Sequence, residues 1–288
     1  MASVELKSAS AHSLDDLASI CNRAFAGYIG RIPHHTAETM QKYITSSFVD
    51  LDLSRVFYVN NAPSGFALIA KRYPKFRLAA MGIVPESQGK GVGTAAMKLL
   101  VEEARVRGDA VFELEVIEQN TSAVHLYRRA GFETMRRLIG WECESPSPVG
   151  NVDESLEIER IPIQEVAKVL GEYGDPDLPW QLAGFSLGGY AEPSWVGFRL
   201  GAAYAVISNP EDDVVRHMSC FVLPERRLEG QATRLLNALF TKYPGKKWSA
   251  TPLLPVEYSE RLATKFGFRK MDLNQLQMRL NFEGMKSD

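Results

Sequence analysis

The sequence predicts an α/β protein of mixed α+β character, built from two tandem domains that are each a twisted mixed β-sheet flanked by helices. Three observations support this fold class. The chain has 288 residues, which is long for one typical domain and suits two. A stretch of the first half returns in altered form in the second half. Extended apolar runs also alternate with helix-like patterns, as they do in α/β proteins.

The repeat consists of two segments that recur in the same order. "VPESQGKGVGT" (84–94) aligns with "LPERRLEGQAT" (223–233), an offset of 139, and "HLYRRAGF" (125–132) aligns with "RLATKFGF" (261–268), an offset of 136. So long a period indicates a duplicated domain rather than a solenoid. The segment "ECESPSPVGNVDES" (142–155) is rich in Pro, Ser and Gly and predicts an interdomain linker. The predicted domains are therefore residues 1–148 and 149–288, and residues 154–161 fit the sheet of either one.

The first elements of the chain can be placed by their caps and apolar spacing. Ser13 and Asp16 have the spacing of a capping box ahead of an apolar helical face that includes Leu14 and Leu17. Thr36 is a candidate start for a second helix. Extended runs follow at residues 55–59, 65–70 and 76–84, with turn residues between them.

The remaining elements of the first half continue the alternation. We expect a helix over 94–107, a strand over 111–117 and a helix over 121–130 that ends at Gly131. Within the strand, Phe112, Leu114 and Val116 share one face. Glu113 and Glu115 therefore lie on the opposite face.

Composition restricts the class of protein. A formal charge of −2 and a pI near 6.3 argue against a general nucleic-acid binder. No uninterrupted apolar stretch reaches about 18 residues, and the polar start "MASVELKSAS" lacks a signal-peptide core, so neither a membrane span nor a signal peptide is expected. Cys21, Cys143 and Cys220 are widely spaced, which fits a reducing cytoplasm and predicts no disulfide. No spacing of His, Asp or Glu predicts a metal site.

The first repeated segment places three glycines, Gly89, Gly91 and Gly93, between a predicted strand and a predicted helix. The first N–H groups of a helix are unpaired and lie at the positive end of its dipole. Loss of side chains there lets a phosphate approach those groups closely, and Gln88 and Lys90 can add a donor and a charge. The alternative is a glycine-rich turn without a ligand. The sequence lacks the GK[ST] end of a P-loop and the last glycine of a dinucleotide fingerprint.

Two motifs together resemble the GNAT family of acyl-CoA-dependent N-acetyltransferases. The family's [QR]xxGx[GA] signature is similar to residues 88–93, and "MGIVP" (81–85) resembles the strand that pairs with the cofactor's pantetheine arm. "LEVIEQNTSAVHLYRRAGF" (114–132) matches the family pattern LxVxxxNxxAxxLYxxxGF. The resemblance covers residues 81–132 directly, and the repeat extends it to the whole chain.

The resemblance implies acetyl-CoA (coenzyme A) as co-substrate and an amine of a small molecule, peptide or protein as acceptor. It implies cofactor contacts from Asn120, although Asn120 could equally be a helix N-cap. The other implied cofactor-binding residues form one strand segment and one loop: Met81, Gly82, Ile83, Gln88, Gly89, Lys90, Gly91, Val92, Gly93 and Thr94.

Acyl transfer to an amine needs a neutral amine, a donor to the carbonyl oxygen and a proton for the departing thiolate. The backbone around Ile83 can supply the donor. Tyr127 matches the family's general acid, and the alternative is a core tyrosine, because it shares an apolar helical face with Ala123 and Ala130. Glu115 resembles the base of the ribosomal-protein N-acetyltransferases. Its alternative is a solvated strand glutamate.

The acceptor is expected near "FAGYIGRIPHH" (25–35), where Tyr28, Arg31, His34 and His35 are candidates and an ordinary surface loop is the alternative. In the second half, Leu228 and Glu229 replace Gly89 and Lys90, which predicts a degenerate copy without chemistry. Direct transfer is expected because no cysteine lies near the motifs. A non-catalytic acyl-CoA-binding sensor or interaction protein, and transfer of a longer acyl group, are alternatives. The amine and the oligomeric state stay open.

Overall fold

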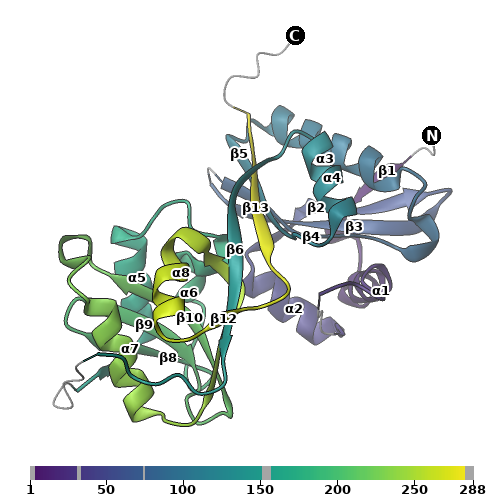
Figure 1. Ribbon diagram of the computed structural model, residues 1–288. Helices are drawn as coiled ribbons and strands as arrows, with labels where there is room; N and C mark the ends of the chain where they lie inside the picture. Colours follow the sequence, from purple (N-terminus) through teal and green to yellow (C-terminus); the bar gives the residue numbers. More distant parts are fainter. Residues whose placement is uncertain (1–3, 31–33, 74, 151–156, 283–288) are drawn as a thin grey trace. The chain divides into compact units, whose positions relative to one another are not determined.

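The computed structural model describes residues 4–30, 34–73, 75–150 and 157–282. The chain divides into two compact units, which we describe separately (Figure 1). The first unit contains residues 1–135 and 276–288, and the second contains residues 136–275. The chain therefore passes between the units twice, within β6 (Glu133–Cys143) and at the start of β13 (Gln275–Asn281).

The sheet of the first unit has the strand order β1-β2-β3-β4-β5-β13. The pairs β1–β2, β2–β3 and β3–β4 are antiparallel, and β4–β5 is parallel. Their bounds are β1 (Glu5–Ser8), β2 (Val49–Val59), β3 (Ala62–Arg72), β4 (Lys75–Ile83) and β5 (Val111–Ile117). The sheet is mixed, as the sequence predicts.

Four helices supply the two cores of this sheet. α1 (Leu14–Ala24) and α2 (Ala37–Ser46) form one core with side chains from β2 to β4. α3 (Val92–Arg107) and α4 (Thr121–Arg129) pack on a second core that includes apolar side chains of β5 and β13. The caps behave as predicted: Ser13 and Asp16 form the capping box of α1, Thr36 caps α2, and Gly131 is left-handed just beyond α4.

The second unit has a comparable sheet with the order β6-β11-β10-β9-β8-β7. Its strands are β7 (Glu159–Ile161), β8 (Trp195–Leu200), β9 (Ala203–Ser208), β10 (Val214–Val222) and β11 (Lys247–Pro255), and the short β12 (Arg269–Lys270) pairs with β6. Its helices are α5 (Ile163–Tyr173), α6 (Gly184–Leu187), α7 (Gln231–Lys242) and α8 (Val256–Lys265). Both units thus combine a mixed sheet with flanking helices.

The described residues of the segment predicted as a linker, 142–150, belong to the second unit. β6 runs through Glu142 to Cys143, and the backbone N–H and C=O of Val149 bond the Asn237 side chain of α7, each at 2.9 Å. Residues 151–156 lie outside the described part. β7 pairs with β8, so residues 159–161 open the second sheet. The units also divide the chain differently from the predicted 1–148 and 149–288, because β13 returns to the first sheet.

Candidate acyl-CoA site

A fork between β4 and β5 lies at the centre of the candidate site. The parallel pairing of these strands runs from Lys75↔Val111 to Leu78↔Leu114 and stops there. One residue later, Ala79 is an extra residue on β4, since Leu68 of β3 pairs with Ala80 and Ile69 pairs with Leu78. A bulge bends a strand and ends regular pairing. Beyond it, among the described residues, β4 pairs with β3 alone, so its other edge has no strand partner there.

The predicted strand residues Met81, Gly82 and Ile83 form the end of β4 beyond this bulge. Gly82 has a packing reason of its own: a Cβ there would lie 2.8 Å from the Cβ of Ala24 in α1. The glycine therefore lets α1 approach β4 closely.

The glycine loop joins β4 to α3. Gly89 and Gly91 are left-handed, with φ of +70° and +80°, and Gly91 is the N-cap of α3. The helix begins at Val92, two residues before the predicted start, and its first backbone bond runs from the Ala95 N–H to the Gly91 carbonyl. The N–H groups of Val92, Gly93 and Thr94 therefore precede the helical hydrogen bonds, which is the arrangement that binds phosphates.

Gln88 has a specific structural position in this loop. Its side-chain Nε2 donates to the Ile83 carbonyl at 2.9 Å, which ties the loop back to the end of β4. Gly93 lies where a Cβ would be 3.5 Å from Leu126 of α4 and 3.7 Å from Ile83, both ordinary contact distances. The strand end, the loop and α4 thus converge at Gly93.

Asn120 and Tyr28 lie together at the start of α4. The Asn120 side chain accepts from the Ala123 N–H at 3.2 Å and caps the helix, so the N-cap role is present. Burial raises the pKa of Tyr28, and a hydrogen bond with Asn120 opposes that rise. Tyr28 therefore links the α1–α2 connection to α4.

Tyr127 is buried in the core of the first unit, with its side chain among the α3 and α4 residues. Its ring centroid is 6.0 Å from that of Phe132. Burial raises the pKa of the Tyr127 hydroxyl well above its usual value, and the nearby Tyr28 adds to the rise. The hydroxyl is consequently protonated throughout the neutral range, as a proton donor must be.

Glu115 is not the solvated strand glutamate that the sequence left as an alternative. Its side chain is 2% exposed, and its Oε2 accepts a hydrogen bond from Arg77 Nε at 2.6 Å. Glu113, on the same face of β5, is also buried and pairs with Arg279 of β13 and Lys75 of β4. Both carboxylates are therefore held by cations.

Of the predicted acceptor residues, Tyr28, His34 and His35 are described, and Arg31 lies outside the described residues. Asn22 of α1 holds His35 at both its backbone groups, with two bonds of 2.8 Å. Burial lowers the pKa of His35, and the neighbouring His34 lowers it further. Neither Asn22 nor Arg77 was predicted as a site residue. For Arg77 the available signal was a charged residue inside an apolar strand.

The second unit repeats the loop geometry with different side chains. Leu228 and Gly230 are left-handed, with φ of +65° and +77°, where the first loop has Gly89 and Gly91. Arg227 Nε bonds the Val222 carbonyl at 3.1 Å, as Gln88 bonds Ile83, and Glu229 pairs with Arg226 at 2.7 Å. The left-handed conformation is strained for a leucine, and Leu228 is 96% exposed. A leucine and a carboxylate thus stand where a phosphate would need space.

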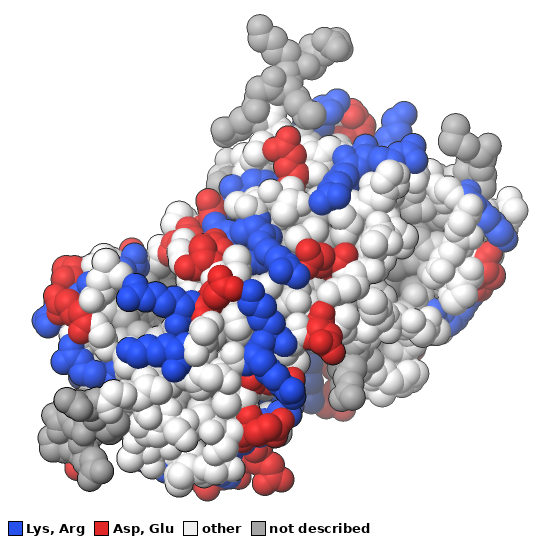
Figure 2. Space-filling view, viewed as in Figure 1, with Lys and Arg blue, Asp and Glu red and all other residues white. Residues whose placement is uncertain are grey.

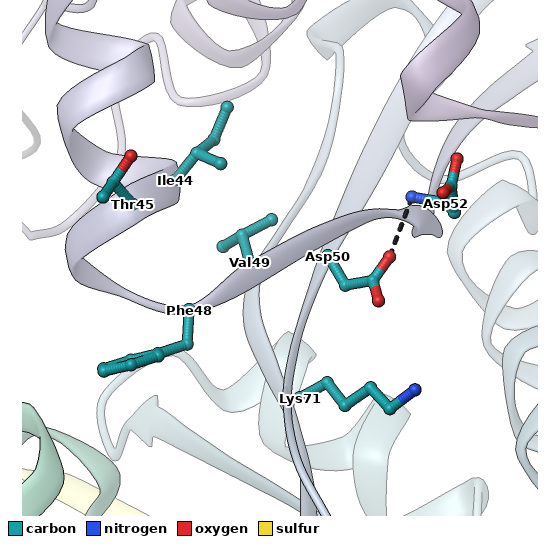
Figure 3. A pocket seen from close by; sticks show the side chains of 7 residues that line it. All are labelled: Ile44, Thr45, Phe48, Val49, Asp50, Asp52 and Lys71. Carbon is teal, nitrogen blue, oxygen red and sulfur yellow. Dashed lines mark hydrogen bonds between the residues drawn. The ribbon is translucent and has the colours of Figure 1, made fainter.

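A separate hollow of about 560 Å³ lies elsewhere on the first unit (Figure 3). Asp50, Asp52 and Lys71 line it together with apolar side chains, and Asp50 Oδ1 accepts from the Asp52 N–H at 3.0 Å. Lys71 pairs with Phe76 near the start of β4, whereas the glycine loop follows the end of that strand. The hollow is therefore not part of the candidate site.

Two further surface properties concern possible partners. Among the described residues, no helix combines the length and the apolar composition needed to cross a bilayer. On the face in Figure 2, basic and acidic side chains are interspersed.

Comparison with known proteins agrees with this geometry. Residues 17–132 match the family model described as Acetyltransferase (GNAT) family. An uncharacterized N-acetyltransferase of Methanocaldococcus jannaschii is 39% identical over 57 residues, which are 20% of this chain and 25% of that protein. Streptothricin acetyltransferase of Streptomyces lavendulae is 37% identical over 71 residues, 24% of this chain and 38% of that protein. The chain thus spans well under half the length of these relatives.

Solved structures extend the likeness to the whole fold. A tandem GNAT protein from the clavulanic acid biosynthesis pathway superposes with a TM-score of 0.62, covering 99% of this chain and 100% of that chain at 13% identity. At that identity the match shows the fold alone. Residues 17–132 therefore match the acetyltransferase (GNAT) family model, and the whole chain is similar in fold to a tandem GNAT protein.

Proposed function

We propose that the protein is an N-acetyltransferase that moves an acetyl group from acetyl-CoA to a primary amine by direct attack. The observation that carries the proposal is the convergence of three parts at Gly93: the end of β4 beyond the fork, the start of α3 and the α4 helix that bears Tyr127. A pantetheine arm at the free edge of β4 can pair with its backbone while the pyrophosphate meets the N–H groups of α3. The fork directs such a thioester toward α4.

Different groups of the protein are then proposed to stabilise the carbonyl oxygen and to protonate the leaving thiolate. A backbone N–H near Ile83 would donate to the carbonyl oxygen as its charge develops. The Tyr127 hydroxyl would give its proton to the departing thiolate, and burial favours this because it keeps the hydroxyl protonated. The C–N bond forms as the C–S bond breaks, and the amine loses one proton.

Glu115 is the candidate base for that proton, and its environment sets a condition on the role. The Arg77 guanidinium already bonds one oxygen of this carboxylate, Oε2, at 2.6 Å. Base catalysis by Glu115 predicts that Glu115→Gln loses most activity at neutral pH and recovers at high pH, where free amine is abundant. A loss that does not change with pH excludes this role.

The second unit is proposed to be a degenerate copy that binds no acyl-CoA. Leu228 occupies the position of Gly89, and Glu229, paired with Arg226, puts a carboxylate where the first loop has Lys90. We also place the protein in the cytoplasm, on the reducing environment that its isolated cysteines indicate.

The test is a broad panel of amines with acetyl-CoA, in which release of the free thiol is followed and acetylated product is identified by mass spectrometry. Two partly similar proteins are named streptothricin acetyltransferase and thialysine N-epsilon-acetyltransferase, so streptothricin and thialysine are reasonable first members of the panel. Thiol release that depends on a particular amine supports the proposal. Tight acetyl-CoA binding without turnover on any amine would favour the alternative, a non-catalytic acyl-CoA sensor.

A further inference from the structure

The side-chain bond between Arg77 and Glu115 crosses the point at which β4 and β5 separate. In the backbone register, Arg77 lies opposite Glu113, within the paired part of the two strands. Its guanidinium instead bonds Glu115, the first residue of β5 beyond the last pair, Leu78↔Leu114. The ion pair therefore connects the closed part of the fork on β4 to the open part on β5.

Burial makes this connection stiff. The two side chains are 7% and 2% exposed, so solvent screens their attraction weakly. The guanidinium is planar and donates along fixed directions, which restricts the geometry of its partner more than a lysine would. Opening or closing the fork would have to distort or break this pair inside the protein, where an unpaired charge is costly.

A second contact holds the other arm of the fork. The Tyr43 hydroxyl, from α2, donates to the carbonyl of Ala79 at 3.0 Å. Ala79 is the extra residue of the β4 bulge. Tyr43 is also close enough to Arg77 to interact with its charge. Tyr43 therefore contacts the bulge directly and lies close to the ion pair between Arg77 and Glu115.

We propose that Arg77 is a positioning residue that, with Glu115 and Tyr43, sets the width of the β4–β5 fork and thereby the affinity for the acyl-CoA arm. The inference rests on the proposed function, because the fork must receive the cofactor. It gives Glu115 a positioning role, which is the alternative to the base role described above, and the pH dependence of Glu115→Gln turnover decides between the two. Nothing in it requires Arg77 to touch the cofactor.

The chain supplies a matched control on the same face of the same strand. Glu113 is also buried and paired with cations, Arg279 and Lys75, but it lies within the closed part of the fork. Substitution of either Glu113 or Glu115 breaks a buried ion pair and lowers stability. Only Glu115 lies beyond the last backbone pair, Leu78↔Leu114, so only its loss is expected to change cofactor affinity.

The experiment measures acetyl-CoA dissociation constants by calorimetry and unfolding temperatures by circular dichroism. Arg77→Met, Glu115→Leu and Tyr43→Phe are compared with the controls Glu113→Leu and Arg279→Met. We expect the Arg77 and Glu115 variants to bind at least tenfold more weakly, with Tyr43→Phe intermediate. Glu115→Gln, which keeps an acceptor for Arg77, should retain more affinity than Glu115→Leu. The controls should unfold earlier and bind as the wild type does.

A double variant covers the case in which a single one does not fold. Arg77→Met with Glu115→Leu leaves no unpaired charge, so it should fold better than either single variant and still bind weakly. Wild-type affinity in the folded double variant, or equal loss in the Glu113 controls, overturns the inference. Recovery of Glu115→Gln turnover at high pH also overturns it, because that result assigns a base.

The outcome that refutes the proposed acetyltransferase function can be distinguished from the outcome that refutes the positioning role of Arg77. Wild-type protein that binds acetyl-CoA but acetylates no amine refutes the transferase, while the affinity comparison still decides the role of Arg77. Wild-type protein that does not bind acetyl-CoA overturns both.

Discussion

β13 (Gln275–Asn281) is expected to be essential to the first unit, although it follows the second unit in the sequence. Truncation after Gln275 would remove nearly all of β13 from its place beside β5 (Figure 1). Leu276, Met278 and Leu280 are at most 7% exposed and share a core with Tyr127. At about 1.5–3 kcal/mol for each buried side chain, their loss removes about 5–9 kcal/mol. A domain has only about 5–15 kcal/mol of stability in total.

Polar losses add to this estimate. Arg279 would no longer neutralise the buried Glu113, and the Phe282 N–H would no longer bond the Ala110 carbonyl at 3.0 Å. We therefore expect the first unit of a chain ending at Gln275 to be unfolded at 25 °C, even though residues 81–132 are intact. The same argument predicts that residues 1–150 alone are insoluble or inactive, since they also lack β13.

The assay is thermal unfolding by circular dichroism together with limited proteolysis of the first unit. Truncation after Phe282 is the control, because it keeps every β13 contact named above. Met278→Ala is the milder perturbation, with an expected cost of about 2–5 kcal/mol because this side chain is fully buried. A chain ending at Gln275 with the unfolding temperature and protease resistance of the full chain would refute the reasoning.

Three other predictions concern the candidate site. Tyr127→Phe should keep the fold and the acetyl-CoA affinity but lower kcat by about 10²–10⁴, and unchanged kcat on the true acceptor would rule out the acid role. Because burial raises the pKa of Tyr127, its deprotonation should not lower the wild-type kcat up to about pH 10. Gly91→Asp should abolish acetyl-CoA binding. The control is Gly108→Asp, because Gly108 is also left-handed with open surroundings but lies at the far end of α3; it should only lower the unfolding temperature. Equal effects of the two substitutions on acetyl-CoA affinity would show that the loop is not part of the site. Calorimetry should give one acetyl-CoA per chain, and two equivalent sites would contradict the degenerate second copy.

Local pattern was enough for the parts of the fold that depend on neighbouring residues. The capping box of Ser13 and Asp16, the strand Val111–Ile117 and the left-handed Gly131 were all predicted where they occur. Each is decided within a few residues by a cap, by alternation or by glycine's freedom. The start of α3 was misplaced by two residues, because left-handed Gly91 serves as its N-cap and the helix begins at once.

Long-range pairing was beyond the reach of the sequence alone. β6 was missed, and part of it was interpreted as a linker, because its strand partners lie more than 100 residues later in the chain. β13 has no motif of its own, and its position beside β5 follows from hydrogen bonds and packing that exist only in the folded sheet.

The candidate site shows the same division. The sequence predicted the glycine loop as a phosphate site, because the loop brings backbone N–H groups to a helix start, and the resemblance to a known family added Asn120 and Tyr127 as site residues. It placed Glu115 on the correct strand but left its surroundings open. Only the tertiary structure brought Arg77 to Glu115, since a strand residue's cross-strand contact depends on register and on where the ladder ends. Pairing between distant segments determines which charges are buried together, and no local pattern encodes it.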